Sequence, residues 1–212
     1  MTQGAAAVLT LEAWNRCWAE LGASTTPASV HAELVSRYSE PHRAYHTLQH
    51  LQECLALRAE LATRCESPAE IDIALWFHDA IYEPARNDNE ARSAGWLDTV
   101  AAQAGLARDV RDRLNALVMV TRHSAMPATP DEAVLVDIDL AILGAPPERF
   151  AEYEVQVRQE YRWVPEWLYR RKRREILAGF LDRETIYSTP ECRQRFEDQA
   201  RRNLAQSVAA LG

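Results

Sequence analysis

Residues 67–79 have the sequence SPAEIDIALWFHD, and this stretch decides the fold class. It begins with a capping hydroxyl, a proline at the first helical position and a glutamate at the third, which together are typical of a helix start. The residues that then recur at the spacing of one helix face are Ile71, Ala74, Leu75 and His78. The stretch therefore predicts a helix over 68–81 whose buried face ends on His78 and Asp79.

The same two signals, helix caps and apolar residues at helical spacing, recur along the whole chain. Thr129 and Pro130 repeat the start signal, and Thr26 and Thr189 begin weaker versions of it. Residues 133–143 (AVLVDIDLAIL) have the composition of a buried strand, but their cap and length favour a buried helix. The predicted helices cover about 10–22, 27–38, 48–65, 68–81, 88–104, 107–122, 130–143, 147–162, 165–182 and 190–210.

The absence of strands from this pattern predicts an all-α protein. We expect a single helical domain over 1–212, in which a core at about 27–145 is covered by C-terminal helices at about 146–210.

Composition and charge narrow the class of protein. The chain has 212 residues and a net charge of -7. This acidic balance argues against a nucleic-acid coat or a polybasic membrane surface, because both need clustered positive charge. No apolar run approaches the roughly 20 residues that span a bilayer, and no basic segment precedes the short apolar patch near the start.

The cysteines indicate a reducing environment. The four of them include no C-x-x-C pair, which favours reduced, packed thiols. We expect a cytoplasmic protein whose partners include neither a membrane nor a nucleic-acid polymer. A homo-oligomer is compatible with the sequence.

A run of five basic residues at 170–174 (RRKRR) lies inside a helical pattern. Long basic side chains usually cover a solvated helix face, which is the simplest interpretation here. The alternative is that one or two of these side chains turn inward and bind an anion.

Histidines mark one end of a predicted helical hairpin. Thr47 is a plausible N-cap, which puts His50 in the first turn of its helix and on the same face as Cys54. Consecutive helices joined by a short loop tend to run antiparallel, so the start of this helix lies near the end of the next. We therefore expect His50 and His78 to meet.

A further carboxylate comes from the predicted helix at 130–143. Asp139 is the only charge on the stripe of Leu135, Ile138 and Ile142. Asp137 is also surrounded by apolar residues, so the residues alone leave both open. A buried aspartate needs a partner, which could be a metal ion or an arginine from another helix.

Two imidazoles and two carboxylates form a mixed nitrogen and oxygen site. Such a site suits one divalent ion among Mn, Fe, Ni, Co, Zn and Mg rather than a thiolate-selecting metal. An ion held by four protein ligands keeps positions for water and a substrate oxygen, where it lowers the pKa of the water and polarises a phosphoryl group.

This pattern resembles the H…HD…D signature of the HD-domain superfamily of metal-dependent phosphohydrolases. The match is closer to a bacterial subgroup of predicted HD-superfamily hydrolases. The resembling stretches cover most of the chain: YSEPHRAYHTLQH (38–50), FHDAIY (77–82), DNEARSA (88–94), residues 121–123 and the pattern from 158 to 187.

The resemblance implies an all-α core of at least five helices, with the metal ligands at His50, His78, Asp79 and Asp139. Related members carry acidic groups just after His-Asp that position the attacking water. Here position 82 is Tyr, so only Glu83 could fill that role. The departure at Tyr82 argues against an alarmone-type pyrophosphohydrolase.

Further candidates for catalysis and substrate binding lie near these ligands in sequence. Arg43 and Tyr45 precede His50, and a guanidinium matches phosphate oxygens in a bidentate manner. His46 could be a donor to a ligand, a general acid or a ligand of a second metal. His123, at a helix end, could be a general acid, because the pKa of an ordinary histidine is near neutral.

A second group of substrate-binding candidates lies further along the chain. Asn89 and Glu90 begin the helix after the His-Asp loop, where Asp88 or Asn89 could instead be only an N-cap. Arg158 and Tyr161 are candidate anion-binding residues.

We therefore expect a metal-dependent phosphohydrolase that acts on a phosphate ester or anhydride of a small molecule, with nucleotides among the candidates. A di-iron oxygenase is one alternative, and it would need His46 and His123 as extra ligands. The other alternative is a non-catalytic ligand-binding module that keeps the metal for structure.

Overall fold

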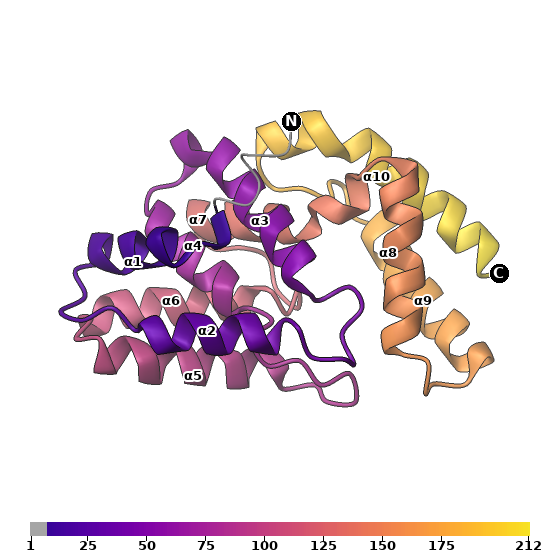
Figure 1. Cartoon of the computed structure of the whole chain (residues 1–212). Coiled ribbons are helices and arrows are strands. Elements are labelled where there is room, and N and C mark those ends of the chain that lie inside the picture. The colour runs from indigo at the N-terminus through magenta and orange to yellow at the C-terminus, as the bar shows by residue number, and fades with distance from the viewer. Residues whose placement is uncertain (1–7) are drawn as a thin grey trace. The chain divides into compact units, whose positions relative to one another are not determined.

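The computed structural model describes residues 8–212, and every regular element among them is a helix, which confirms the predicted all-α fold (Figure 1). The chain divides into two compact units, residues 1–138 and 139–212. The predicted single domain over 1–212, with a core at about 27–145, stays a prediction. The division between the two units falls after Ile138, inside the last turn of helix α7.

The first unit consists of seven α-helices and a short 3-10 helix among the described residues. Their bounds are α1 Leu11–Glu20, α2 Ala28–Arg37, α3 Leu48–Glu60, η2 Ala62–Arg64, α4 Pro68–Phe77, α5 Asn89–Gln103, α6 Arg108–Val120 and α7 Pro130–Asp139.

Several of these helices begin where the sequence predicts. The side-chain oxygen of Thr10 accepts a hydrogen bond from Ala13 N, and that of Thr47 accepts one from Gln49 N. Ser67 makes no such cap. Instead, the carboxylate of Asp131 accepts hydrogen bonds from the backbone N–H groups of Glu66 and Ser67, so a residue from α7 supplies the anion at the start of α4.

Helix α4 is the centre of the first unit. It contacts α1, α3, α5 and α6, and every residue from Ala69 to Phe77 is buried. This explains why its sequence is apolar on almost all sides, whereas a surface helix carries one apolar stripe. Trp14 and Trp18 of α1 pack on it and are fully inaccessible to solvent, so the core also includes a helix before residue 27.

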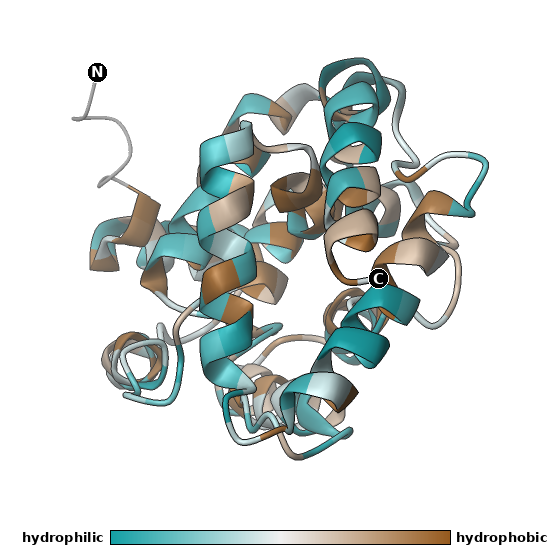
Figure 2. Ribbon diagram, turned by 90° about the vertical axis from the view of Figure 1, so that its right-hand side faces the viewer, coloured by the Kyte–Doolittle hydropathy of each residue, from teal (hydrophilic) through white to brown (hydrophobic). Residues whose placement is uncertain are grey.

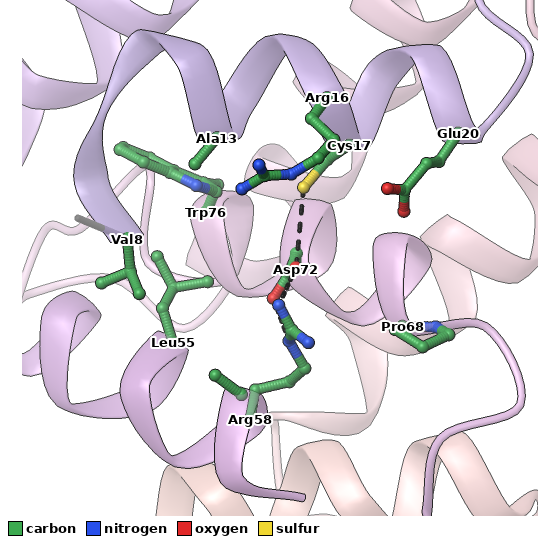
Figure 3. Close-up of a pocket in the computed structure, with 11 residues that line it drawn as sticks. Val8, Ala13, Arg16, Cys17, Glu20, Leu55, Arg58, Pro68, Asp72 and Trp76 are labelled. Carbon is green, nitrogen blue, oxygen red and sulfur yellow. Dashed lines mark hydrogen bonds and ion pairs between the residues drawn. The ribbon is translucent and has the colours of Figure 1, made fainter. Parts of the chain in front are cut away.

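One polar contact joins α1, α3 and α4 inside this core. Asp72 of α4 accepts a bidentate pair of hydrogen bonds from Arg58 of α3 and faces the Cys17 thiol of α1 at 3.5 Å (Figure 3). These groups line a cavity of about 330 Å³. Burial and the nearby carboxylate raise the pKa of Cys17 to about 12, so its thiol stays protonated and unreactive at neutral pH.

The second unit contains a short 3-10 helix and three α-helices, with the bounds η3 Leu140–Gly144, α8 Pro147–Glu160, α9 Glu166–Leu181 and α10 Pro190–Ala210. Asn203 of α10 donates hydrogen bonds to the carbonyls of Leu143 and Ala145, both at 2.9 Å. Tyr187, just before α10, donates to the carbonyl of Leu140 at 3.1 Å. These bonds fix η3 against α10.

The helices of both units carry hydrophilic and hydrophobic residues along the same ribbon, as amphipathic helices do (Figure 2). None of the helices from residue 8 onward combines the length and apolar character that crossing a bilayer requires.

Candidate metal centre

His78 and Asp79 follow directly on α4. The helix was predicted to continue to 81 but ends at Phe77, with His78 as its C-cap. The backbone of His78 keeps helical angles, φ -56° and ψ -39°, so its side chain still continues the buried face and is only 1% exposed. The ring is held by its Nδ1, which lies 2.8 Å from the carbonyl oxygen of Leu75.

This contact decides which nitrogen of His78 can bind a metal. Because a carbonyl oxygen only accepts hydrogen bonds, Nδ1 must carry the proton, so Nε2 is the nitrogen whose lone pair the neutral ring can present to a metal. A carbonyl that fixes a histidine in this way is the usual outer-shell partner of a ligating imidazole.

His50 comes to the same point from α3. Thr47 caps this helix, which places His50 in its first turn, where it is 2% exposed. Its Nε2 lies 3.2 Å from Nε2 of His78. The start of α3 therefore meets the end of α4, as the predicted hairpin requires.

Asp79 adds an oxygen to the two nitrogens. Its Oδ2 lies 2.9 Å from Nε2 of His78 and 3.6 Å from Nε2 of His50. Burial alone would raise the pKa of Asp79, but the neighbouring imidazoles of His78, His46 and His50 outweigh it and lower that pKa well below its ordinary value. Asp79 is therefore an anion at neutral pH.

Asp139 is the carboxylate that the geometry adds from α7. It is the last residue of this helix, whose preceding residues belong to the first unit. His50, His78 and Asp139 each offer one ligand atom, and these atoms lie within 4.8 Å of one another. Asp137, the rival on the same helix, is fully buried and is not part of this group.

The separations fit a single ion. Ligands bound at roughly 2.1 Å in tetrahedral or octahedral geometry lie about 3.0–3.4 Å from each other. The two Nε2 atoms, 3.2 Å apart, already have this spacing. The histidine and aspartate donors could therefore hold a borderline divalent metal ion, while its identity is left open by this donor set.

Arg43 is buried against the backbone of the candidate metal centre. Its side chain is inaccessible to solvent and lies between the rings of Tyr38 and Tyr82. It donates hydrogen bonds to the carbonyl oxygens of residues 46, 79 and 80, at 3.2, 2.7 and 3.1 Å, and to Glu40. A guanidinium that is buried and engaged in this way has few donors left for a phosphate, so this geometry does not favour the predicted phosphate clamp.

What Arg43 does instead is join the two ligand-bearing segments. The carbonyls that it binds belong to the segment just before His50 and to the segment that contains Asp79. A planar donor group that reaches both segments fixes their separation. We therefore assign Arg43 a positioning role.

Tyr45, His46 and Tyr82 form an aromatic wall beside the histidines. The ring of Tyr45 lies 4.7 Å from the ring of His50, and Tyr45 is only 4% exposed, which suits packing of the imidazole better than contact with substrate. His46 stacks on Tyr82 at 4.1 Å and lies 6.0 Å from His50. At position 82 the sequence departs from the acidic pattern of the family that it resembles. The tyrosine at this position is thus the residue that supports His46.

Glu83 and Asn89 stabilise the loop after Asp79. The side chain of Asn89 accepts a hydrogen bond from Glu83 N and donates one to Glu83 O. Glu83 itself is about half exposed at 52% and pairs with Arg92, which lowers the pKa of this carboxyl. A paired, exposed carboxylate is a weak general base, so the arrangement does not favour Glu83 in catalysis. Glu90 is half-buried in the first turn of α5.

Three predicted residues remain, namely His123, Arg158 and Tyr161. His123 follows α6 in a turn with φ 52°, a conformation that is uncommon for a residue other than glycine. Arg158 and Tyr161 belong to the second unit. There Arg158 donates to the carbonyls of Tyr161 and Val164 and pairs with Glu166, so it stabilises the turn between α8 and α9.

Sequence reasoning missed the carbonyl-binding role of Arg43 and the support that Tyr82 gives to His46. Both residues lie inside YSEPHRAYHTLQH and FHDAIY, two of the stretches that carry the family resemblance. That location was the signal in the sequence that could have identified them. Which backbone carbonyls meet a guanidinium depends on how the two stretches pack, and no spacing in the sequence reports that.

Comparison of the chain with models of protein families, with curated proteins and with solved structures found no match.

Proposed function

We propose that this protein is a metal-dependent phosphohydrolase of the HD-superfamily type, acting on a phosphate ester or anhydride of a small molecule, with nucleotides among the candidates. The observation that carries the proposal is the convergence of Nε2 of His50, Nε2 of His78 and a carboxylate oxygen of Asp79 within 3.6 Å of one another. Three groups that all accept protons favour a shared cation at their centre.

A divalent ion held there would lower the pKa of a water molecule and polarise a phosphoryl oxygen. The residues of the chain supply the remaining functions. His78 and His50 present ring nitrogens, Asp79 supplies negative charge, and the apolar core behind them excludes water on that side.

His46 is the candidate proton donor to the leaving group. It lies 6.0 Å from the ring of His50 and is held by its stack on Tyr82, so it is close to the ligands without belonging to the group of donor atoms. Proton transfer by a positioned side chain contributes roughly 10²–10⁴-fold to a rate.

The metal assignment is tested by elemental analysis of His78→Ala and Asp79→Ala after dialysis. We expect about one ion per chain in the wild type and a loss of most of it in both variants. His31→Ala is the matched control, because His31 is half-buried beside Trp14 and bonds to the carbonyl of Leu9, outside the metal centre. Full metal occupancy in His78→Ala would contradict the assignment of the metal ligands. Two ions per chain would favour the di-iron alternative.

The reaction is tested with a panel of nucleotides and phosphomonoesters in the presence of Mn, Co, Ni or Mg. We expect turnover that His78→Ala abolishes and that His46→Gln slows at least about 100-fold while the metal is retained. Metal occupancy and tight ligand binding without turnover of any compound would contradict a hydrolase and favour a binding module.

A further inference from the structure

A basic groove lies in the second unit between α9 and the end of α10. Its volume is about 630 Å³, within the range of small-molecule sites. The lining residues are Trp167, Arg170, Arg171, Arg174, Glu175 and Ala178 from α9, and Val208, Leu211 and Gly212 from the C-terminal end (marked C in Figure 2). Three of the five basic residues at 170–174 thus line one groove.

The arginines of the groove keep a net positive charge. Glu175 is the acidic side chain of the lining. Its carboxylate pairs with Lys172, a residue outside the groove, at 2.8 Å and with Arg171 at the longer distance of 4.0 Å. Lys172 therefore neutralises most of the charge of Glu175, and the guanidinium groups of Arg170, Arg171 and Arg174 are left without an equal number of carboxylates.

These guanidinium groups also have N–H groups that a ligand could accept hydrogen bonds from. Arg174 is exposed and makes no hydrogen bond or ion pair within the described part of the chain. Arg171 lies over the ring of Trp167 at 5.6 Å, and its side chain is 58% exposed. Arg170 donates to the carbonyl of Ala210 at 2.7 Å, which ties α9 to the end of α10.

The wider charge distribution fits a local anion site. Residues 139–212 hold 13 of the 24 basic residues but only 12 of the 31 acidic ones, so the acidic excess of the chain lies in residues 1–138. Arg173, the remaining basic residue of the run, is buried and pairs with Glu154, so it does not contribute to the groove.

Two features of the lining define the ligand. Guanidinium groups bind phosphate oxygens in a bidentate manner. Trp167 is 65% exposed, and an exposed indole beside arginines is a platform on which a planar base can stack. We propose that the groove binds a phosphorylated aromatic ligand of the nucleoside-phosphate class, with its phosphates on Arg171 and Arg174 and its ring against Trp167. This site does not depend on the metal centre.

The test is calorimetric titration of ADP into the full chain in the presence of EDTA, with the His78→Ala variant so that the metal centre cannot contribute. We expect saturable binding of one ADP per chain, and binding of adenosine and of inorganic phosphate that is each at least about 10-fold weaker. The variant Arg171→Ala/Arg174→Ala should weaken ADP binding at least about 10-fold, and Trp167→Ala should weaken it about 5- to 100-fold.

The matched control removes the same charge outside the groove. Arg193 and Arg202 are exposed on α10 and do not line the groove, so Arg193→Ala/Arg202→Ala should leave the affinity for ADP within about twofold of wild type. Equal losses in both double variants would show a non-specific charge effect and would overturn the proposal. Absence of ADP binding would also overturn it, whether or not single-stranded RNA or anionic phospholipid vesicles then bind.

Discussion

At the scale of single residues, Arg43 shows most clearly what the fold adds to the sequence. A guanidinium next to a candidate metal site suggests a phosphate ligand, yet this one is buried and binds three backbone carbonyls. Five fixed N–H groups in one plane allow such contacts, and an ammonium group cannot reproduce them. The residue therefore supports the candidate metal centre through the backbone that carries its candidate ligands.

We predict that Arg43→Lys lowers the affinity for the metal by about 10- to 100-fold, as changes in the outer shell of metal sites do. The variant should also lose about 1–3 kcal/mol of unfolding free energy, because buried carbonyls lose their donors. Metal titration and urea unfolding measure the two effects separately.

The control is Arg173→Lys, since Arg173 is a buried arginine of the second unit that pairs with Glu154. It should lower stability without changing the affinity for the metal. Unchanged affinity in Arg43→Lys would show that Arg43 serves stability alone.

At the scale of elements, helix packing is set by close approaches as much as by apolar stripes. A Cβ on Gly144, at the end of η3, would lie 2.7 Å from the carbonyl oxygen of Phe196 and 3.0 Å from its Cα. The backbone of α10 can approach η3 this closely only because residue 144 has no side chain. A Cβ on Gly179, in α9, would instead meet no atom within 4 Å.

These two glycines give opposite predictions. Gly144→Ala should destabilise the protein by about 1–3 kcal/mol, because overpacking forces the backbone of α10 to move. Gly179→Ala should stabilise it by about 0.5–1 kcal/mol, because alanine has the higher helix propensity. Chemical unfolding of both variants checks the pair, and a stabilised Gly144→Ala would contradict the packing of η3 on α10.

At the scale of the whole molecule, ion pairs on exposed helices determine the response to acid. Arg111 of α6 binds both carboxylate oxygens of Asp98 on α5, and the pKa of Asp98 is lowered by this bond. Asp88, beside Arg86, and Asp109, beside Arg113, have their pKa values lowered in the same way. Burial raises the pKa of Asp72 and opposes this trend.

We therefore expect the unfolding free energy to fall in acid. A carboxyl group whose pKa is lower in the folded state stabilises the protein above its unfolded value of about 3.9, and this contribution disappears as the pH falls through the folded value. Urea unfolding in EDTA at pH 7, 5 and 3.5 measures the effect. Asp98→Asn should flatten the decrease, and equal stability at pH 5 and 3.5 would contradict the ion-pair account.

The sequence by itself determined the helical class, the helix starts at Thr47 and Pro130, and the stripes that carry His50 and His78. These features depend on local spacing and on caps, which act over a few residues. Helix ends were less predictable. We expected α3 to reach 65 and α7 to reach 143, whereas they end at Glu60 and Asp139 and are followed by 3-10 turns.

Only the tertiary structure decided which side chains face each other. The choice of Asp139 over Asp137, the burial of Arg43, the pairing of Glu83 with Arg92 and the alignment of three arginines with the end of α10 all depend on contacts between segments far apart in sequence. The physical reason is that helical spacing fixes the direction of a side chain on its own element. Its partner is fixed by how the elements pack.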